Sequence, residues 1–425
     1  MADDGYLSDL ARELAGDALG RFLRYVQVDT RSDPHSTTFP STEKQLDLLR
    51  LLAEECRELG LDEVEFDEHG YVTATLPATV DRELPTLAFA AHVDTYPGVT
   101  GTDVKPQVVR YEGGDLPLPG DPAQVLTPQD MPLLEGHVGH ELVTSDGTTL
   151  LGADDKAGVA EIMAAAAYLL RHPELEHGRI RLLFNPDEEI GRGMDRLDLD
   201  RLGADAAFTL DGARRGELED ETFSATKATV TFRGRSTHTG TAKGVMVNAI
   251  KAAGDFLAAL PRDGLSPETT EEREGFVHPD ELTGDVEETR VILILRDFDD
   301  EQLAGHGELV RRLAEEAARG RGAEVDVELV RQYANMKRFI DDPRILEAAE
   351  EAIRRAGMEP KREIIRGGTD GSRLSERGLP CPNLSTGGHD YHSRREWICV
   401  ADMGAAASTI VHLAQVWAET DTAVA

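Results

Sequence analysis

Between residues 86 and 210 the chain alternates short apolar segments with longer helical ones, and this alternation limits the folds that it can adopt. The segment Thr86–Ala91 (TLAFAA) is a continuous apolar run, which is typical of a strand covered on both faces. A predicted helix over Ala157–Leu170 follows, and then predicted strands over Ile180–Asn185 and Ala206–Leu210. Strands and helices in this order indicate the α/β class, with a mainly parallel mixed sheet and helices on both faces.

We expect two domains, because a chain of 425 residues is too long for one ordinary core. The pattern of predicted strands and helices changes after Asp211. Past Asp211, alternating strands accompany two helices, which predicts an α+β two-layer sandwich with one sheet face uncovered by its own chain. The α/β pattern resumes after about residue 335. We therefore predict a first domain over residues 1–218 and 335–425, split by an inserted domain over residues 219–334.

A long segment from Gly98 to Thr148 has little periodicity and is rich in Gly, Pro and acidic residues. It is too long to be a simple connection between two elements of a compact domain. Segments of this length usually carry function or fold locally, and we expect one of these two here.

The charge of the chain restricts its partners. The net charge is -35, from 80 acidic and 45 basic residues, so the field of the protein would repel nucleic acid and anionic membranes, and small molecules are the expected partners. The sequence has no apolar run near the roughly 20 residues of a membrane span. Because its first residues (MADDGYLSDLARELAG) are acidic, unlike a signal peptide, we expect a cytoplasmic protein.

The three cysteines, Cys56, Cys381 and Cys399, are odd in number and scattered along the chain. This distribution argues against a disulfide framework and against a metal site with cysteine ligands. We expect three buried thiols.

Two adjacent aspartates, Asp154 and Asp155, lie between glycines at the start of the predicted helix, in LLGADDKAGV. In isolation such a pair more often caps a helix, because aspartate accepts hydrogen bonds from the free N–H groups of the first turn. The alternative is a metal site. Matching polar residues elsewhere in the chain favour the second interpretation for Asp154, whereas Asp155 is expected to shape the turn and cap the helix.

Polar side chains follow the other predicted strands or the strand–helix junctions. They are His92, Asp94, Glu188, Glu189, Asp211 and His392. The carboxyl ends of strands in an open α/β sheet meet at one crevice, so these residues can come together there. Histidines with carboxylates suit zinc, with cobalt or manganese as plausible substitutes, and the set is large enough for two ions. A water bound by such a pair would be the nucleophile.

Each of these residues also has an ordinary structural interpretation. His92 alone could be a partly buried histidine, and Asp211-Gly212 a turn. Glu188 and Glu189 alone would be a solvated helix start, but adjacent glutamates allow one to bind metal while the other acts as a general base. On composition alone either His389 or His392 could be the ligand.

Eight segments together resemble a known family. They are HVDT from residue 92, TLLGADDKAG from 149, NPDEEIG from 185, LDG from 210, THTGTAKGVMVNA from 237, LRDFD from 295, RGGTDG from 366 and PNLSTGGHDYH from 382. The wider family is that of the two-zinc peptidases, which includes carboxypeptidase G, acetylornithine deacetylase and succinyl-diaminopimelate desuccinylase. TAKGVMVNA, RGGTDG and the loop with Glu112-Gly-Gly-Asp115 resemble the peptidase T group of tripeptide aminopeptidases.

The resemblance implies a di-zinc centre in a zinc-peptidase-like fold. His92 and Asp211 would bind one zinc, Glu189 and His392 the other, and Asp154 would bridge both. The peptide between Asp154 and its neighbour would be cis in this family. The inserted domain would serve as a dimerisation or lid domain, and the enzyme would be a homodimer acting on small peptides.

The resemblance also implies catalytic roles. Glu188 would be the general base that takes a proton from the attacking water and delivers it to the leaving amine, and Asp94 would orient His92. His238, which could also be a surface loop histidine, would reach the active site across a dimer and stabilise the oxyanion.

Two arginines, Arg296 and Arg366, are candidates for binding the terminal carboxylate of the peptide, with ordinary salt bridges as the alternative. The chain departs from the family pattern at His389, where a tyrosine is expected, and at Thr239, where a proline is expected. Because the Tyr391-His392 pair is kept, we assign the ligand to His392 and expect His389 to lie behind the ligands, in an unknown role. The expected activity is that of a di-zinc tripeptide aminopeptidase, with a related amidohydrolase or dipeptidase as the alternative enzyme and a metal-free binding protein as the alternative class.

Overall fold

A computed structural model describes residues 4–420 of the chain. Residues 1–3 and 421–425, which the predicted first domain included, lie outside the described residues. The chain divides into two compact units. Among the described residues, the first unit comprises 4–220, 339–363 and 369–420, and the second comprises Glu221–Arg338 and Ile364–Gly368. The short segment Ile364–Gly368 leaves the first unit, which no sequence pattern predicts.

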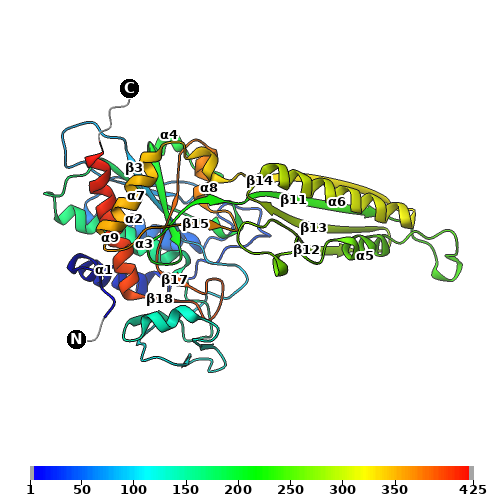
Figure 1. Ribbon diagram of the computed structural model, residues 1–425, viewed down its shortest axis with the longest axis horizontal. Helices are drawn as coiled ribbons and strands as arrows, with labels where there is room; N and C mark the ends of the chain where they lie inside the picture. Colours follow the sequence, from blue (N-terminus) through cyan, green and yellow to red (C-terminus); the bar gives the residue numbers. More distant parts are fainter. Residues whose placement is uncertain (1–3, 421–425) are drawn as a thin grey trace. The chain divides into compact units, whose positions relative to one another are not determined.

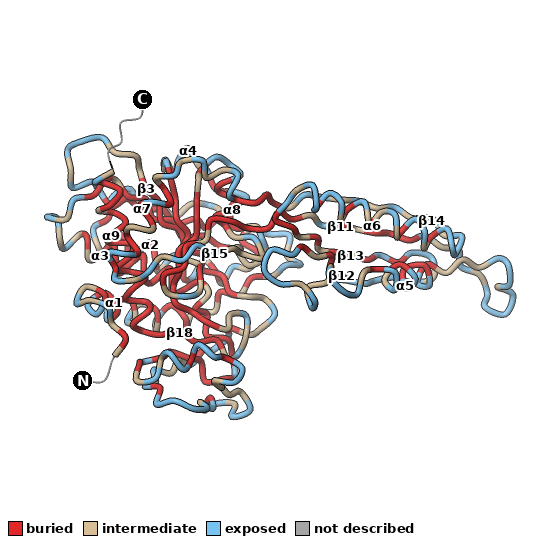
Figure 2. Tube along the Cα trace, in the orientation of Figure 1, coloured by how far each residue is buried: buried red, intermediate tan, exposed pale blue. Residues whose placement is uncertain are grey.

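An eight-stranded mixed sheet forms the centre of the first unit (Figure 1), in the order β1-β2-β8-β3-β9-β16-β10-β15. The strands are β1 (Asp62–Phe66), β2 (Val72–Leu76), β3 (Leu87–His92), β8 (Ile180–Asn185), β9 (Ala206–Gly212), β10 (Glu217–Thr222), β15 (Lys361–Ile365) and β16 (Asn383–Ser385). β3 runs parallel to β8 and β9, and β16 runs parallel to β9. β3 and β8 are buried along their whole length (Figure 2), as the continuous apolar run predicted.

Helices cover both faces of this sheet. Alternate side chains of β3 point to opposite faces, so each face presents apolar side chains to a helical layer. Leu87 and Phe89 pack with the main helical layer, whereas Ala88 and Ala90 belong to a smaller cluster on the other side. The main layer contains α1 (Asp9–Tyr25), α2 (Gln45–Leu59), α3 (Ala153–Arg171), α7 (Pro343–Arg355) and α9 (Val400–Glu419). The smaller cluster contains α4 (Leu199–Leu202) and α8 (Asp370–Glu376). The first and last of these helices, α1 and α9, pack against each other.

The long segment from residue 98 to 148 folds locally. It contains β4 (Gln107–Arg110), β5 (Leu116–Pro117), β6 (Val125–Leu126), the short 3-10 helix η1 (Pro132–His137) and β7 (Glu141–Thr144). β4 and β7 join a four-stranded sheet with β17 (Gly388–His389) and β18 (Trp397–Cys399) from the end of the chain. Side chains of this segment and of the strand β18 form a separate small hydrophobic core, which includes Tyr111, Leu134 and Trp397.

The second unit is a two-layer α+β sandwich. Its antiparallel sheet has the order β12-β13-β11-β14. The elements are β11 (Ser224–Arg233), α5 (Ala249–Ala259), β12 (Phe276–Gly284), β13 (Glu288–Asp297), α6 (Asp300–Arg321) and β14 (Glu324–Tyr333). One face of the sheet carries Val230, Phe232 and Leu293, which pack against α5 and α6. These helices supply Phe256 and Val310 to the same core.

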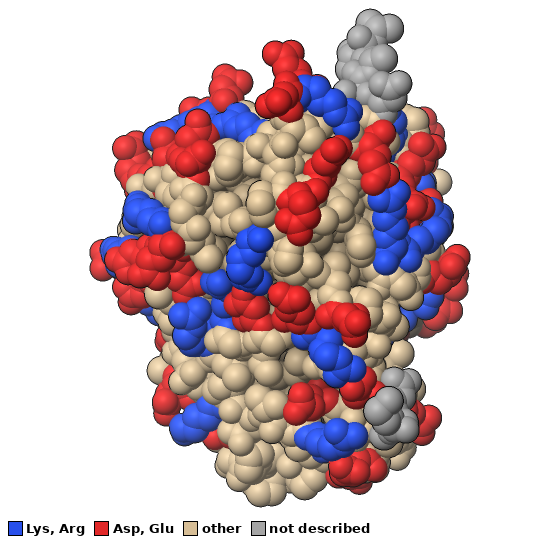
Figure 3. All heavy atoms as spheres, turned by 90° about the vertical axis from the view of Figure 1, so that its left-hand side faces the viewer, with Lys and Arg blue, Asp and Glu red and all other residues tan. Residues whose placement is uncertain are grey.

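Among the described residues, none of the helices combines the length and the apolar character needed to cross a bilayer. Acidic and basic side chains are interspersed over the face drawn in Figure 3, and no extended basic area interrupts this pattern there. That face therefore lacks the electrostatic footprint of a nucleic-acid interface.

We expect Gly158→Ala to destabilise the first unit, because the glycine lets α3 approach β9. A Cβ at this position would lie 2.0 Å from the carbonyl oxygen of Leu210, so the helix must shift. The predicted loss in the free energy of unfolding is about 1–3 kcal/mol by chemical denaturation. Gly16→Ala in α1, where a Cβ meets nothing within 4 Å, is the control and should be neutral or slightly stabilising. Equal effects of the two substitutions would contradict this explanation.

Candidate metal centre

The residues of the centre lie where elements of the first unit end. β3 ends at His92, and the short 3-10 helix η2 (Glu188–Ile190) follows β8. Asp211 lies near the end of β9, and Asp154 near the start of α3. β3, β8 and β9 are parallel neighbours, so their carboxyl ends meet at one edge of the sheet.

The Asp154 carboxylate lies between two imidazoles. Its Oδ1 is 3.1 Å from Nε2 of His92, and its Oδ2 is 3.1 Å from Nε2 of His392. His92 is almost fully buried, and the ring of His392 stacks on Tyr96 with 4.2 Å between centroids. One carboxylate thus presents an oxygen to each side of the centre.

The other carboxylates divide between the two histidines. Glu189 Oε2 is 3.0 Å from His392 Nε2, whereas Asp211 Oδ1 is 3.6 Å and Glu188 Oε2 is 4.0 Å from His92 Nε2. The possible ligand atoms form two groups, each within 4.8 Å: His92 with Glu188 and Asp211, and Asp154 with Glu189 and His392. The structure brings together all five residues that the resemblance assigned to metal, with Glu188 beside them.

Asp94 contacts both His92 and the η2 backbone. Its carboxylate accepts hydrogen bonds from the backbone N–H groups of Glu188 (2.9 Å) and Glu189 (3.2 Å). Nδ1 of His92 lies 3.0 Å from the carbonyl oxygen of Asp94 and 3.4 Å from its Oδ1. A proton on Nδ1 would leave Nε2 free to act as a ligand, and this hydrogen bond favours that tautomer.

Burial and crowding of carboxylates shift the pKa values of the centre. Burial, reinforced by Asp154, raises the pKa of Glu189 to about 8 and that of Asp211 to about 6. Burial also raises the pKa of Glu188. For His392 burial acts in the opposite direction, but hydrogen bonds to Asp154 and Glu189 raise its pKa to about 11. The centre is therefore a buried place where carboxylates outnumber cations.

The donor set fits divalent metal ions. Buried carboxylates are costly unless positive charge compensates them. Two imidazole nitrogens and carboxylate oxygens are the ligands that zinc prefers when no thiolate is present. Oε1 of Glu189 is buried and has no hydrogen-bond partner, which leaves it free to bind an ion.

The Asp154–Asp155 peptide is cis, as the resemblance implied. The expected capping role of Asp155 is wrong, because neither of its carboxylate oxygens accepts a hydrogen bond from the first turn of α3. Oδ2 of Asp155 instead accepts a hydrogen bond of 3.2 Å from the backbone N–H of His92, and Oδ1 has no partner. Asp155 thereby links the turn to the end of β3.

Sequence reasoning missed two buried acids. Glu396 accepts hydrogen bonds from three backbone N–H groups of the DD turn: Leu151 (2.9 Å) and Gly152 (2.8 Å) on Oε2, and Asp154 (3.0 Å) on Oε1. Asp370 is hydrogen bonded to the side chain of Asn185 at the end of β8, and burial raises its pKa to about 7. The RGGTDG segment could have pointed to Asp370, but nothing local marks Glu396.

The other predicted site residues lie in the second unit. His238 is exposed, and its Nδ1 accepts a hydrogen bond of 3.1 Å from Gly240. Arg296 lies over the ring of Tyr333. Arg366 donates to the carbonyl oxygens of Glu272 and of other residues in the same loop, and it lies over two phenylalanine rings. Their roles toward a substrate remain predictions.

Comparison with known proteins defines the class of this chain. The model of peptidase family M20/M25/M40 matches residues 137–416. Peptidase T of Geobacillus thermodenitrificans is 48% identical over 400 residues, which are 93% of this chain and 97% of that protein. Peptidase T of Desulfitobacterium hafniense is 49% identical over 402 residues, 94% and 98% of the two chains. The chain belongs to peptidase family M20/M25/M40.

Solved structures agree with this assignment. Aminopeptidase PepT from Bacillus cereus aligns with a TM-score of 0.73 and 25% identity, over 95% of this chain and 99% of that one. A dinuclear metal-binding M20 peptidase from Bacillus subtilis has the same fold, with a TM-score of 0.66 and 17% identity over 96% and 100% of the chains. The predicted fold class, the resemblance to peptidase T and the metallo-aminopeptidase class are confirmed.

We expect Glu396→Gln to weaken the DD turn, because an amide has one acceptor oxygen where the carboxylate has two. At least one of the three backbone N–H groups would lose its acceptor, at a cost of about 1–3 kcal/mol. Denaturant unfolding of the metal-free protein measures this loss. Glu54→Gln, on the exposed side of α2, is the matched control and should stay within about 0.5 kcal/mol of wild type. An unchanged unfolding midpoint for Glu396→Gln would refute its role in the turn.

Proposed function

We propose that this chain is a di-zinc aminopeptidase that removes the N-terminal residue of tripeptides, with Glu188 as the general base. The observation that carries the proposal is the position of the Asp154 carboxylate, which contacts Nε2 of both His92 and His392 while Glu188 lies on the His92 side. The similarity to peptidase T over more than nine-tenths of the chain supports the substrate class.

In this proposal His92 and Asp211 hold one zinc ion, Glu189 and His392 hold the second, and Asp154 binds both. Zinc at such a centre supplies Lewis acidity toward the scissile carbonyl and lowers the pKa of water. Co2+ and Mn2+ prefer similar ligands and are substitutes that would retain some activity.

Glu188 remains available for proton transfer. The backbone N–H of Glu188 donates a hydrogen bond to Asp94, which fixes the position of the residue. Among the described residues, no side chain donates a hydrogen bond to the Glu188 carboxylate. Burial raises the pKa of Glu188, and a general base works best when its pKa approaches the operating pH. An oxygen of Glu188 takes the proton of the attacking water and passes it to the nitrogen of the leaving amine.

His238 supplies a hydrogen-bond donor in this proposal. Because Nδ1 accepts from the Gly240 N–H, the proton of the neutral ring is on Nε2. An Nε2–H group can donate to an oxygen on which negative charge develops. We assign this role to His238 from a second protomer, in a homodimer formed by the second unit, where Ile250 and Leu282 are about half exposed (48% and 54%).

Arg296 and Arg366 remain the candidates for the terminal carboxylate of the peptide. Arg366 already donates to backbone carbonyl oxygens, which holds its guanidinium in place, and Arg296 is the less constrained of the two.

We expect Glu188→Gln to lower kcat by about 10²–10⁴-fold while two metal ions stay bound, because the amide cannot accept the proton. Metal content of the purified protein and initial rates on a tripeptide measure both quantities. Glu189→Gln is the comparison: it removes a proposed ligand, so metal content should fall together with activity. Turnover of Glu188→Gln within a few-fold of wild type would exclude Glu188 as the base.

A panel of matched peptides tests the substrate class. A tripeptide should be cleaved faster than the dipeptide and the tetrapeptide, and acetylation of its N-terminus should abolish cleavage. The acetyl group removes an amine that is largely protonated near neutral pH and that a carboxylate-rich centre attracts. Efficient cleavage of the acetylated peptide would instead indicate a related amidohydrolase.

A further inference from the structure

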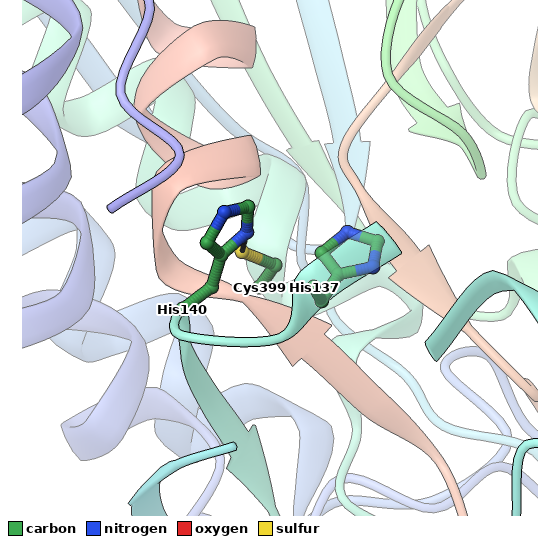
Figure 4. Close-up of side chains that lie close together, drawn as sticks. All are labelled: His137, His140 and Cys399. Carbon is green, nitrogen blue, oxygen red and sulfur yellow. Dashed lines mark hydrogen bonds between the residues drawn. The ribbon is translucent and has the colours of Figure 1, made fainter. Parts of the chain in front are cut away.

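A second group of metal-binding side chains lies in the first unit, and the proposed peptidase mechanism does not use it. His137 ends η1, His140 follows in the turn before β7, and Cys399 lies at the junction of β18 and α9 (Figure 4). The possible ligand atoms of these three residues lie within 4.8 Å of one another. His389 and Asp402 form an overlapping group of the same kind with His137.

The distance between two of the three side chains is close to that between ligands of a tetrahedral zinc site. Sγ of Cys399 is 3.9 Å from Nδ1 of His140. Zinc–sulfur and zinc–nitrogen distances of about 2.3 and 2.0–2.1 Å at a tetrahedral angle place these two atoms roughly 3.5 Å apart. A shift of a few tenths of an ångström in the two side chains would therefore accommodate an ion.

His137 is already oriented as a ligand. Its Nδ1 is 2.9 Å from the carbonyl oxygen of Leu133, which fits an Nδ1–H donor. A histidine that binds metal through one nitrogen usually donates from the other to a backbone carbonyl or a carboxylate. Nε2 of His137 donates a hydrogen bond of 3.2 Å to Oδ2 of Asp402, so an ion bound at Nε2 would replace the proton of this hydrogen bond.

His389 provides an independent observation. It is 9% exposed, and its Nε2 is buried without a hydrogen-bond partner. Its ring stacks on Trp397 with 4.1 Å between centroids and lies 5.8 Å from the ring of His137. The stacking gives the ring face a packing partner but leaves Nε2 of His389 without a hydrogen bond. A buried nitrogen without a hydrogen bond destabilises the fold unless another group binds it.

We propose that His137, His140 and Cys399 bind one zinc-class divalent ion outside the peptidase centre, with Nε2 of His389 beside the fourth coordination position. Thiolate together with imidazole is a donor set that favours zinc and cobalt over magnesium or calcium. All the ligands are buried or nearly so, which is typical of a structural rather than a catalytic zinc site. The ion would fasten the locally folded segment of residues 98–148 to the start of α9.

The proposed site differs from the expectation that no cysteine binds metal. The two histidines lie more than 250 residues from Cys399 in the chain, so they form no spacing motif. Only the pairing of β7 with β18 brings them together. His389, which departs from the family pattern, acquires a place beside the fourth ligand position.

Cobalt substitution tests the proposal, because the peptidase centre contains no thiolate. The chain is stripped of metal, reloaded with Co2+ and examined by absorption spectroscopy, where a Co2+–thiolate bond gives an intense charge-transfer band in the near ultraviolet. We expect this band in wild type and about three Co2+ per chain. Cys399→Ser should lose the band and one equivalent, whereas Cys56→Ser, at another buried thiol, should keep both.

A wild-type protein that binds two Co2+ without the band would overturn the proposal, and the histidines would then be a packed aromatic cluster only. A band that persists in Cys399→Ser would overturn it as well. The wild-type spectrum needs no variant, so a folding defect of Cys399→Ser leaves the test intact. His140→Gln gives a second arm, in which the band should also be lost.

Discussion

The structure depends on one electrostatic constraint, the burial of several carboxylates around two imidazoles. Asp154 is shared by His92 and His392, and the neighbouring acids raise one another's pKa values because few positive charges are near. In the absence of metal this arrangement is costly, since burial favours the neutral form of each acid. Two divalent ions would supply the compensating charge. The free energy of metal binding would then contribute directly to the stability of the centre.

The fold meets this constraint by fixing the backbone segments that carry these side chains, through hydrogen bonds from their N–H groups to other carboxylates. Glu396 binds three N–H groups of the DD turn, Asp155 binds the N–H of His92, and Asp94 binds the N–H groups of η2. Gly158 lets α3 pack directly on β9, so the turn is pressed against the strand that carries Asp211. Acidic side chains thus position the three backbone segments from which His92, Asp154 and Glu189 project.

The fold class and the meeting of the candidate ligands at one edge of the sheet could be predicted from the sequence because strands and their ends form a local pattern, whereas the proposed role of each ligand came from the family resemblance. A buried parallel strand is a continuous apolar run, and its last residue is where a ligand is expected. Glu396 and Asp370 could not be found in this way, since each acts on a segment far away in the chain and has no period or spacing. Asp155 was assigned to capping for the same reason: the sequence does not indicate that its acceptor faces β3. The cluster of His137, His140 and Cys399 likewise exists only through strand pairing.

The central claim, that Asp154 joins two metal ions, is tested most directly by equilibrium titration of metal-free protein with Zn2+. The Cys399→Ser background isolates the peptidase centre from the additional site. The account predicts two tightly bound equivalents in this background, and loss of at least one equivalent with weaker binding of the other when Asp154→Ala is added. Two equivalents bound with unchanged affinity in the Asp154→Ala protein would contradict it.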